Sequence, residues 1–311
     1  MFPAGTVLPN RFSGFGTVGD HGMFGGGRSA TIDEVVTIDL ISFSSGGSAA
    51  SHGDLSEARW RLDCGSDGDN VMFVAGTAPS GTTDTRDMKT FSSTATAVDH
   101  GNLSVARYRP SASSNGADIM VGGGFASGSI LDVVDMNSFT STATAVDHGD
   151  LAAPRFKSCA GSNGFEVLFS GGEDINGNIG TVEKKTFGST AVAVGHGNLS
   201  VVRRNLAGGS DGTIMLGCGG LEGTNSKSNV VDRQTFASSA NATSHGTLSV
   251  ARGRLAATSN STYLMIGGGI DPSAESDYVD LVAFASNTTS TSHGTLSEAR
   301  HNLAGASGFA S

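Results

Sequence analysis

The histidines and arginines of this chain are the side chains best suited to acid–base chemistry, metal binding or charge pairing, and they recur at a fixed spacing. One set of histidines lies 48 or 49 residues apart, each followed by glycine: His52, His100, His148, His196, His245 and His293. Seven residues after each histidine stands an arginine: Arg59, Arg107, Arg155, Arg203, Arg252 and Arg300. A catalytic site needs one asymmetric set of groups, so six equivalent copies indicate a structural role. We predict that each histidine forms a hydrogen bond within its own turn, where the following glycine permits the bend.

An acidic residue recurs in step with the arginines: Asp39, Asp87, Asp135, Glu183, Asp232 and Asp280. Arginine and carboxylate form short, charge-assisted hydrogen bonds. Because the two residue types keep the same period, we predict that each arginine pairs with an acid of its own or an adjacent repeat. A phenylalanine also recurs, and we predict that it lies in the apolar core between repeats: Phe43, Phe91, Phe139, Phe187, Phe236 and Phe284.

Other candidate metal ligands follow no repeated pattern. The chain has three cysteines, Cys64, Cys159 and Cys218. Their odd number and unrelated positions indicate neither a disulfide framework nor a zinc site, so we predict that they are buried. Asp174, Asn176 and Asn178 resemble the opening of a calcium loop, but no glutamate closes that loop. A polar hairpin turn explains the same residues, and no cofactor is predicted.

The fixed period indicates one supersecondary unit repeated along the chain. Within residues 107–148 we expect four strands, at about 107–114, 117–121, 131–139 and 143–147. Asn115-Gly116 between the first two is a strong hairpin signal, because such turns need positive φ. The first strand of each unit is rich in Ala, Gly and Ser, which lets backbones approach closely around an axis. Four antiparallel strands per unit are typical of a β-propeller blade.

The repeat is divided between the two ends of the chain. It begins part-way through a unit near Met23, and residues 300–307 match residues 203–210, the part of the unit missing at the start. Pairing of the C-terminal strand with the N-terminal strands would close a ring and remove its sheet edges. We therefore predict an all-β, six-bladed β-propeller over residues 19–311. Residues 1–18 match no part of the repeat and are expected to form an arm, either flexible or used as an anchor.

Composition argues against several classes of partner. The net charge is −10, whereas nucleic-acid-binding proteins and proteins of anionic membrane surfaces present basic patches. No apolar run approaches 18 residues. The first residues lack the charged and apolar regions of a signal peptide, so we expect no export by the usual secretory route.

The loops between the second and third strands of each unit vary among the copies. In a propeller these loops share one face, where binding usually occurs. The hypothetical binding residues are Asp174, Asn176, Asn178, Glu222, Lys227, Asp271, Glu275 and Asp277. An enzymatic site has less support. A sialidase-like site needs converging arginines and a tyrosine, yet these arginines are repeated and tyrosines are few, and a ring of six histidines would be too wide for metal bonds near 2 Å.

The Gly171-Gly172 pair, the acid and aromatic residue downstream of it, and Pro154-Arg155 resemble the kelch repeat over about residues 19–311, with Phe where kelch has Trp. The element His-Gly-Asn-Leu-Ser-Val-Ala-Arg, residues 100–107, is similar to Phe-Gly-Asp-Leu-Thr-x-x-Arg repeats of kelch-like virion proteins in tailed bacteriophages.

This resemblance implies a non-enzymatic tail or capsid appendage, made in the bacterial cytoplasm and assembled onto the virion. Residues 1–18 would contact other virion proteins, and the variable loops would contact host-surface glycans. Two alternatives stay open: a cellular kelch-type interaction scaffold and a glycan-processing propeller enzyme.

Overall fold

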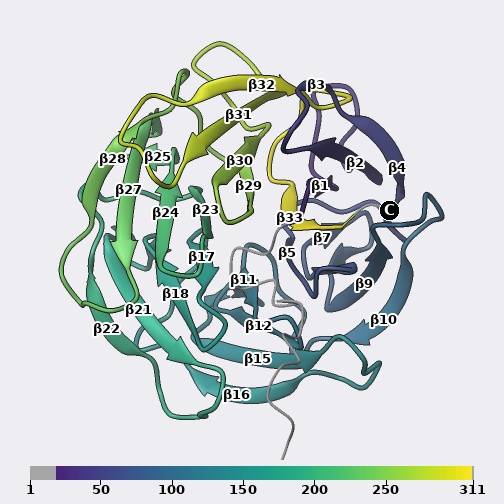
Figure 1. Cartoon of the computed structure of the whole chain (residues 1–311). Coiled ribbons are helices and arrows are strands. Elements are labelled where there is room, and N and C mark those ends of the chain that lie inside the picture. The colour runs from purple at the N-terminus through teal and green to yellow at the C-terminus, as the bar shows by residue number, and fades with distance from the viewer. Residues whose placement is uncertain (1–18, 310–311) are drawn as a thin grey trace, which may run out of the picture.

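A computed structural model describes residues 19–309 as six antiparallel sheets arranged in a ring (Figure 1). The prediction of an all-β, six-bladed propeller is confirmed. The arm expected over residues 1–18 lies outside the described residues. The described part of the chain contains no helix, and so none long and apolar enough to cross a membrane.

Each blade has four strands, which we call A to D from the axis outwards (Figure 1). Blade 1 consists of β33 (Ala304–Gly308), β1 (His21–Gly25), β2 (Thr37–Ser42) and β4 (Ala50–Asp54). Blade 2 consists of β5 (Asp63–Ser66), β6 (Asn70–Val74), β9 (Thr85–Thr90) and β10 (Val98–Asn102). Blade 3 consists of β11 (Ser111–Ser114), β12 (Asp118–Gly122), β15 (Val133–Ser138) and β16 (Val146–Asp150).

The other three blades repeat this order. Blade 4 consists of β17 (Cys159–Ser162), β18 (Glu166–Ser170), β21 (Thr181–Thr186) and β22 (Val194–Asn198). Blade 5 consists of β23 (Ala207–Ser210), β24 (Ile214–Cys218), β27 (Val230–Thr235) and β28 (Thr243–Thr247). Blade 6 consists of β29 (Ala256–Ser259), β30 (Tyr263–Gly267), β31 (Tyr278–Ala283) and β32 (Thr291–Thr295), with a short parallel strand β3 (Gly47–Ser48) from blade 1 at its outer edge.

The ring is closed by the two ends of the described chain, as predicted. Strand β33 pairs with β1 in antiparallel register from His21↔Gly308 to Gly25↔Ala304. The last repeat arginine adds a second closure, because Arg300 Nη2 lies 3.0 Å from Asp39 Oδ2 on β2. Closure therefore depends on both a strand pair and a buried ion pair.

Two strands differ from their expected bounds by three residues or more, and the other two differ by one or two. The A strand of blade 3 begins at Ser111 rather than at residue 107, because Arg109 has a left-handed conformation (φ 54°) that ends the extended segment before it. The D strand contains His148 and runs to Asp150, through a bulge at Gly149 (φ 83°). A Cβ at Gly149 would lie 2.1 Å from Thr190 O of the next blade, so only glycine fits this close approach.

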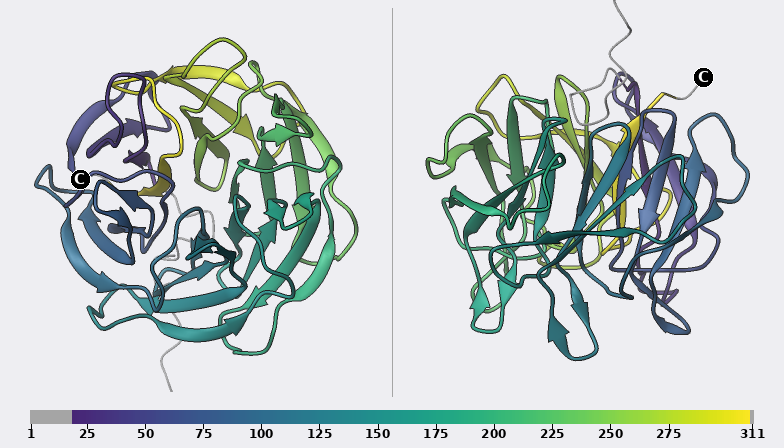
Figure 2. Two further views of the ribbon diagram at one scale, coloured as in Figure 1. Left: turned by 180° about the vertical axis from the view of Figure 1, so that it is seen from behind. Right: turned by 90° about the horizontal axis from the view of Figure 1, so that it is seen from below.

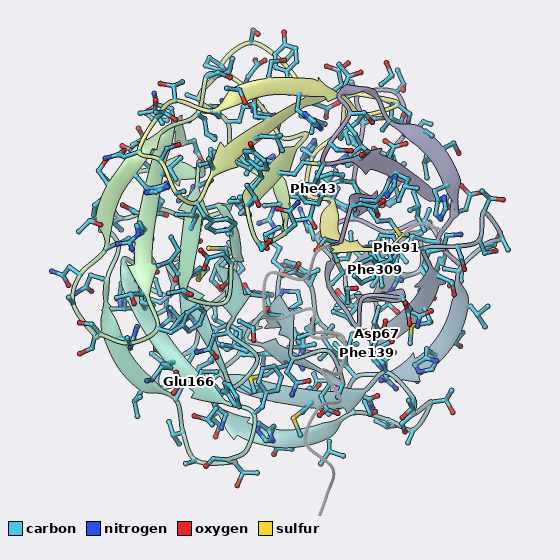
Figure 3. All side chains as sticks on the ribbon, viewed as in Figure 1. Phe43, Asp67, Phe91, Phe139, Glu166 and Phe309 are labelled. Carbon is cyan, nitrogen blue, oxygen red and sulfur yellow. The ribbon has the colours of Figure 1, made fainter. Side chains whose placement is uncertain are left out.

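The apolar core lies between neighbouring blades. One cluster joins Met72 and Val74 of blade 2 to Ile119 and Phe139 of blade 3. Figure 3 labels Phe139 with its equivalents Phe43 and Phe91, and all three are buried. The position predicted for the repeated phenylalanine is therefore confirmed.

The three cysteines are buried and unpaired, as predicted: Cys64, Cys159 and Cys218. Burial raises the pKa of the Cys159 thiol to about 12, so this side chain behaves as a small apolar group.

The ring has two different faces (Figure 2). On the hairpin face, each B–C loop forms a β-bridge with a D–A connection, as between Tyr108 and Phe125. On the opposite, terminal face lie the A–B turns, and both ends of the described chain are there: Gly19 precedes β1, and Phe309 N donates to Gly68 O at 2.9 Å. The expectation that the B–C loops share one face is confirmed, and the D–A connections lie on the same face.

Candidate functional site

The eight predicted binding residues lie on the hairpin face, but on three separate blades. In blade 4 they belong to the hairpin of β19 (Glu173–Asp174) and β20 (Gly177–Asn178), and in blade 5 to that of β25 (Leu221–Glu222) and β26 (Ser226–Lys227). In blade 6, Asp271 and Glu275 belong to a turn closed by the bridge Ile270↔Glu275, and Asp277 directly precedes β31. The structure therefore does not gather them into one cluster.

Arg204 joins the hairpins of blades 4 and 5. Its Nε lies 3.0 Å from Glu173 Oε2, its Nη2 donates to Asn225 Oδ1 at 2.6 Å, and its Nη1 donates to Asn178. Asn178 Nδ2 also donates to Leu221 O at 3.0 Å. Asn178 is thus engaged in holding two hairpins together.

Several of the predicted acids are satisfied locally. Asp174 Oδ1 accepts a bond from Asn176 N at 2.7 Å, which is the pattern of a polar turn. Asp271 accepts bonds from Ser273, which lower the pKa of its carboxyl. Glu275 Oε1 lies 2.9 Å from His301 Nδ1. Among residues 19–309, no group of three or more His, Cys, Asp or Glu side chains is placed to hold a metal ion.

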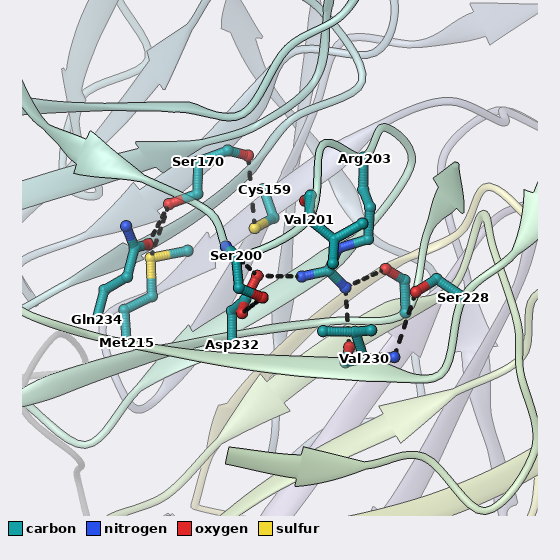
Figure 4. A network of polar contacts seen from close by, with 11 residues as sticks. Cys159, Ser170, Ser200, Val201, Arg203, Met215, Ser228, Val230, Asp232 and Gln234 are labelled. Carbon is teal, nitrogen blue, oxygen red and sulfur yellow. Dashed lines mark hydrogen bonds and ion pairs between the residues drawn. The ribbon is translucent and has the colours of Figure 1, made fainter. Parts of the chain in front are cut away.

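The arginine–acid pairs form in all six blades, within the blade that each arginine enters, and this prediction is confirmed. Figure 4 shows the pair of blade 5, where Arg203 Nη2 donates to Asp232 Oδ2 at 2.6 Å. Arg203 Nη1 also donates to Gly219 O and Val230 O, and Ser200 donates to the same carboxylate. Both charged side chains have 0% exposure, so these pairs are internal to the fold.

The histidine prediction is wrong in its detail. The histidines lie on the D strands, and five of them donate from Nε2 to a backbone carbonyl near the end of strand C in the next blade, as His196 does to Thr235 O at 2.8 Å. The bulge at the following glycine turns the ring toward the neighbouring blade instead of its own turn. The histidines therefore join blades to one another.

A cavity of about 140 Å³ lies on the ring axis, lined by the A strands and, at the hairpin-face end, by the two residues before each of them. The first of these two residues is polar or basic in all six blades. We call those six residues the axial belt. Each stands two positions after a repeat arginine: Arg61, Arg109, Lys157, Asn205, Arg254 and Asn302. Sequence analysis missed this set, although its polar or basic character in every copy was a usable signal.

The backbones of the axial belt form a closed hydrogen-bonded ring. The N–H of each member donates to the carbonyl oxygen of the member in the preceding blade, at 2.7 to 3.2 Å, and Arg61 N completes the circle by donating to Asn302 O. All six members have a left-handed backbone, with φ between 52° and 61°. This conformation directs the N–H and C=O groups around the axis, and the side chains line the cavity.

Positive charge is concentrated at the axial belt. Burial is the first cause of a lowered pKa at Arg61, Arg109 and Arg254, and mutual repulsion among the arginines adds to it at Arg61 and Arg109. The pKa of Arg109 is lowered to about 9. Lys157 Nζ is paired with Glu173 Oε2 at 2.9 Å, whereas the Arg61 guanidinium lies 3.5 Å from the centre of the Trp60 ring.

Asp63, on strand A of blade 2, also lines the axial cavity. Its carboxylate accepts bonds from Cys64 N at 2.9 Å and from Ala112 N at 2.8 Å. Burial nevertheless raises the pKa of Asp63 to about 7, and burial outweighs these two bonds. At lower pH, the neutral form of this side chain is favoured.

The Asp63→Ala variant is expected to flatten the pH dependence of stability. Because the folded pKa is raised, the native chain binds more protons than the unfolded chain between about pH 4 and 7, so the free energy of unfolding falls as pH rises through that window. The free energy of unfolding that depends on Asp63 falls by at most about 4 kcal/mol across this window. Urea unfolding of both proteins at pH 4.5 and 7.5 measures it. Alanine occupies the equivalent position in three blades, and an unchanged slope would contradict the prediction.

No model of a known protein family matches the chain, and no curated protein is significantly similar to it.

Proposed function

We propose that the protein is a non-enzymatic binding and structural component, attached through its terminal face and binding through its hairpin face. The observation that carries this proposal is the separation of the two faces. Both ends of the described chain lie on one side of the ring, and the variable hairpins lie on the other (Figure 2). An attached ring would therefore leave its hairpins accessible to a partner.

More specifically, we propose that the attachment is to a bacteriophage virion, as a tail or capsid appendage. The motif of residues 100–107 supports this assignment by its resemblance to repeats of virion proteins. Residues 1–18, which precede the terminal face, would contact other virion proteins. The exposed hairpin residues, including Ile175 at 91% exposure and Asn176, would contact glycans of the host surface.

Removal of residues 1–18 is expected to reduce incorporation into phage particles at least tenfold while leaving the unfolding transition unchanged, because the described ring lacks none of its strands. Quantitative immunoblots of purified particles measure incorporation. The matched control is the full chain with Ile175→Ser and Asn176→Ser on the hairpin face. This control should be incorporated normally and should bind host cells less well.

Undiminished incorporation of the shortened protein would contradict an anchor at residues 1–18. Absence of the full-length protein from particles would contradict the virion assignment and favour a cellular interaction scaffold.

A further inference from the structure

We propose that the axial cavity is a binding site for an oxoanion, a phosphate, sulfate or carboxylate group, held by Arg61, Arg109 and Arg254 of the axial belt. The proposed site lies on the axis of the ring and includes none of the hairpin residues, so the proposal does not depend on the virion function proposed above.

The charges of the three arginines are not neutralised by a direct ion pair in the described part of the chain, although Glu173 attracts Arg109 from a distance. Among residues 19–309, no carboxylate forms an ion pair with Arg61, Arg109 or Arg254. Residues 1–18 and 310–311 contain no Asp or Glu. Partly buried charges of one sign are costly unless something compensates them. A bound anion would supply the missing charge.

Unused hydrogen-bond donors line the same cavity. Asn302 is 8% exposed, and its Nδ2 has no hydrogen-bond partner among the described residues. The buried Nε atoms of Arg61 and Arg109 also have none there. Buried polar groups without partners are rare in folded proteins. An amide and two guanidinium groups with unused donors therefore line one cavity, which favours a ligand that accepts hydrogen bonds.

Asp63 is the one described carboxylate among the cavity-lining residues, and it does not serve as the missing partner. It is occupied by two backbone N–H groups and forms no ion pair with the axial belt. Burial favours its neutral form, as its raised pKa indicates. Below about pH 7, an anion would therefore enter the cavity beside a mostly uncharged Asp63.

The arginines are not needed to build the axial belt. A left-handed backbone costs a residue with a Cβ roughly 1–2 kcal/mol, which glycine avoids and asparagine tolerates. Blades 5 and 1 carry asparagine, at Asn205 and Asn302, and keep the same backbone hydrogen bonds. Strained residues that the fold does not require are typical of functional sites. The position therefore carries arginine for a reason other than the geometry of the ring.

The cavity limits the size of the ligand. A volume of about 140 Å³ can hold several water molecules, each with a share of about 30 Å³, or one small oxoanion. Guanidinium groups bind phosphate and carboxylate with paired hydrogen bonds. The ligand is therefore either a free inorganic anion or one charged group of a larger molecule, such as the carboxylate of an acidic sugar.

Calorimetric titration of the full chain with inorganic phosphate and, separately, with glucuronate tests the proposal. Arg109→Asn copies the residue that Asn205 and Asn302 provide, so it should keep the backbone ring. We expect it to weaken binding of the anion at least tenfold, and the triple variant R61N/R109N/R254N to abolish binding. The control Arg233→Asn removes an exposed arginine of β27 and should change affinity less than twofold.

The two titrations distinguish the sources of the anion. Binding of phosphate identifies a free oxoanion, whereas binding of glucuronate alone identifies an acidic sugar. Either result supports the site if Arg109→Asn weakens that binding.

Thermal melting without anion provides a second measurement, because the triple variant should melt at a higher temperature than the natural chain once the repulsion among the arginines is relieved. The proposal is overturned if neither anion binds at millimolar concentration, or if Arg233→Asn weakens binding as much as Arg109→Asn.

Discussion

Removal of residues 304–311 is expected to abolish the cooperative unfolding transition of the ring. Strand β33 is the inner strand of blade 1, and its five residues pair with β1. Losing about five backbone hydrogen bonds at about 1 kcal/mol each costs about 5 kcal/mol, a large part of the 5–15 kcal/mol that stabilises a typical domain. The deletion also removes Ala304 and Ala306 from the cluster around Met23, which is 0% exposed. Thermal unfolding followed by circular dichroism measures this effect.

The matched control removes only residues 310–311 and leaves β33 whole. It should unfold as the full chain does. If the chain without β33 keeps the same midpoint and the same steepness of unfolding, the closed ring does not depend on this strand.

The six-bladed ring could be predicted because its repeat, with a period of 48 or 49 residues, can be read directly from the sequence. The distribution of one unit between both ends implied the β33–β1 pair that the structure contains. Arg107 and Asp135 could be matched from sequence, because the two types recur together and opposite charges attract in a buried setting. A repeated residue pair indicates contact even without a known structure.

The direction of a side chain could not be predicted in the same way. His148 was expected to bond within its own turn, but the bulge at Gly149 aims it at Thr186 O of the next blade, 3.2 Å away. The axial belt was missed for a related reason. Its members share a polar or basic character that the sequence shows, but that character does not reveal the left-handed φ, as at Arg109, that brings them to the axis.

Asp135→Asn is expected to destabilise the protein by about 3–5 kcal/mol, because it leaves Arg107 buried without its carboxylate. Both side chains have 0% exposure, and the carboxylate also accepts bonds from Ser104 N and Oγ. Urea unfolding at pH 7 measures the loss. The control is Glu166→Gln, whose partner Lys184 lies 3.1 Å away with 25% exposure on both sides, and it should cost less than about 1 kcal/mol. Equal losses in the two variants would contradict this interpretation.

Blade 4 provides a sharper test of the same pair. It has Glu183 where the other blades have Asp, and Ala152 where the other blades have Ser. Glu183 Oε2 accepts a hydrogen bond from Ala152 N at 2.6 Å. The extra methylene of glutamate thus occurs in the one blade that lacks the serine hydroxyl. In blade 3, Asp135→Glu alone should cost about 1–3 kcal/mol by overpacking against the Ser104 hydroxyl.

Adding Ser104→Ala to Asp135→Glu should recover about 1–2 kcal/mol, and a double-mutant cycle that includes Ser104→Ala alone measures the coupling between the two positions. The double variant reproduces the acid and alanine of blade 4, and Arg155 forms its buried ion pair with Glu183 in that setting. Strict additivity of the two substitutions would mean that the carboxylate is not held jointly by Arg107 and residue 104. A favourable coupling would show that the acid paired with Arg107 and the residue at position 104 are matched to each other in size.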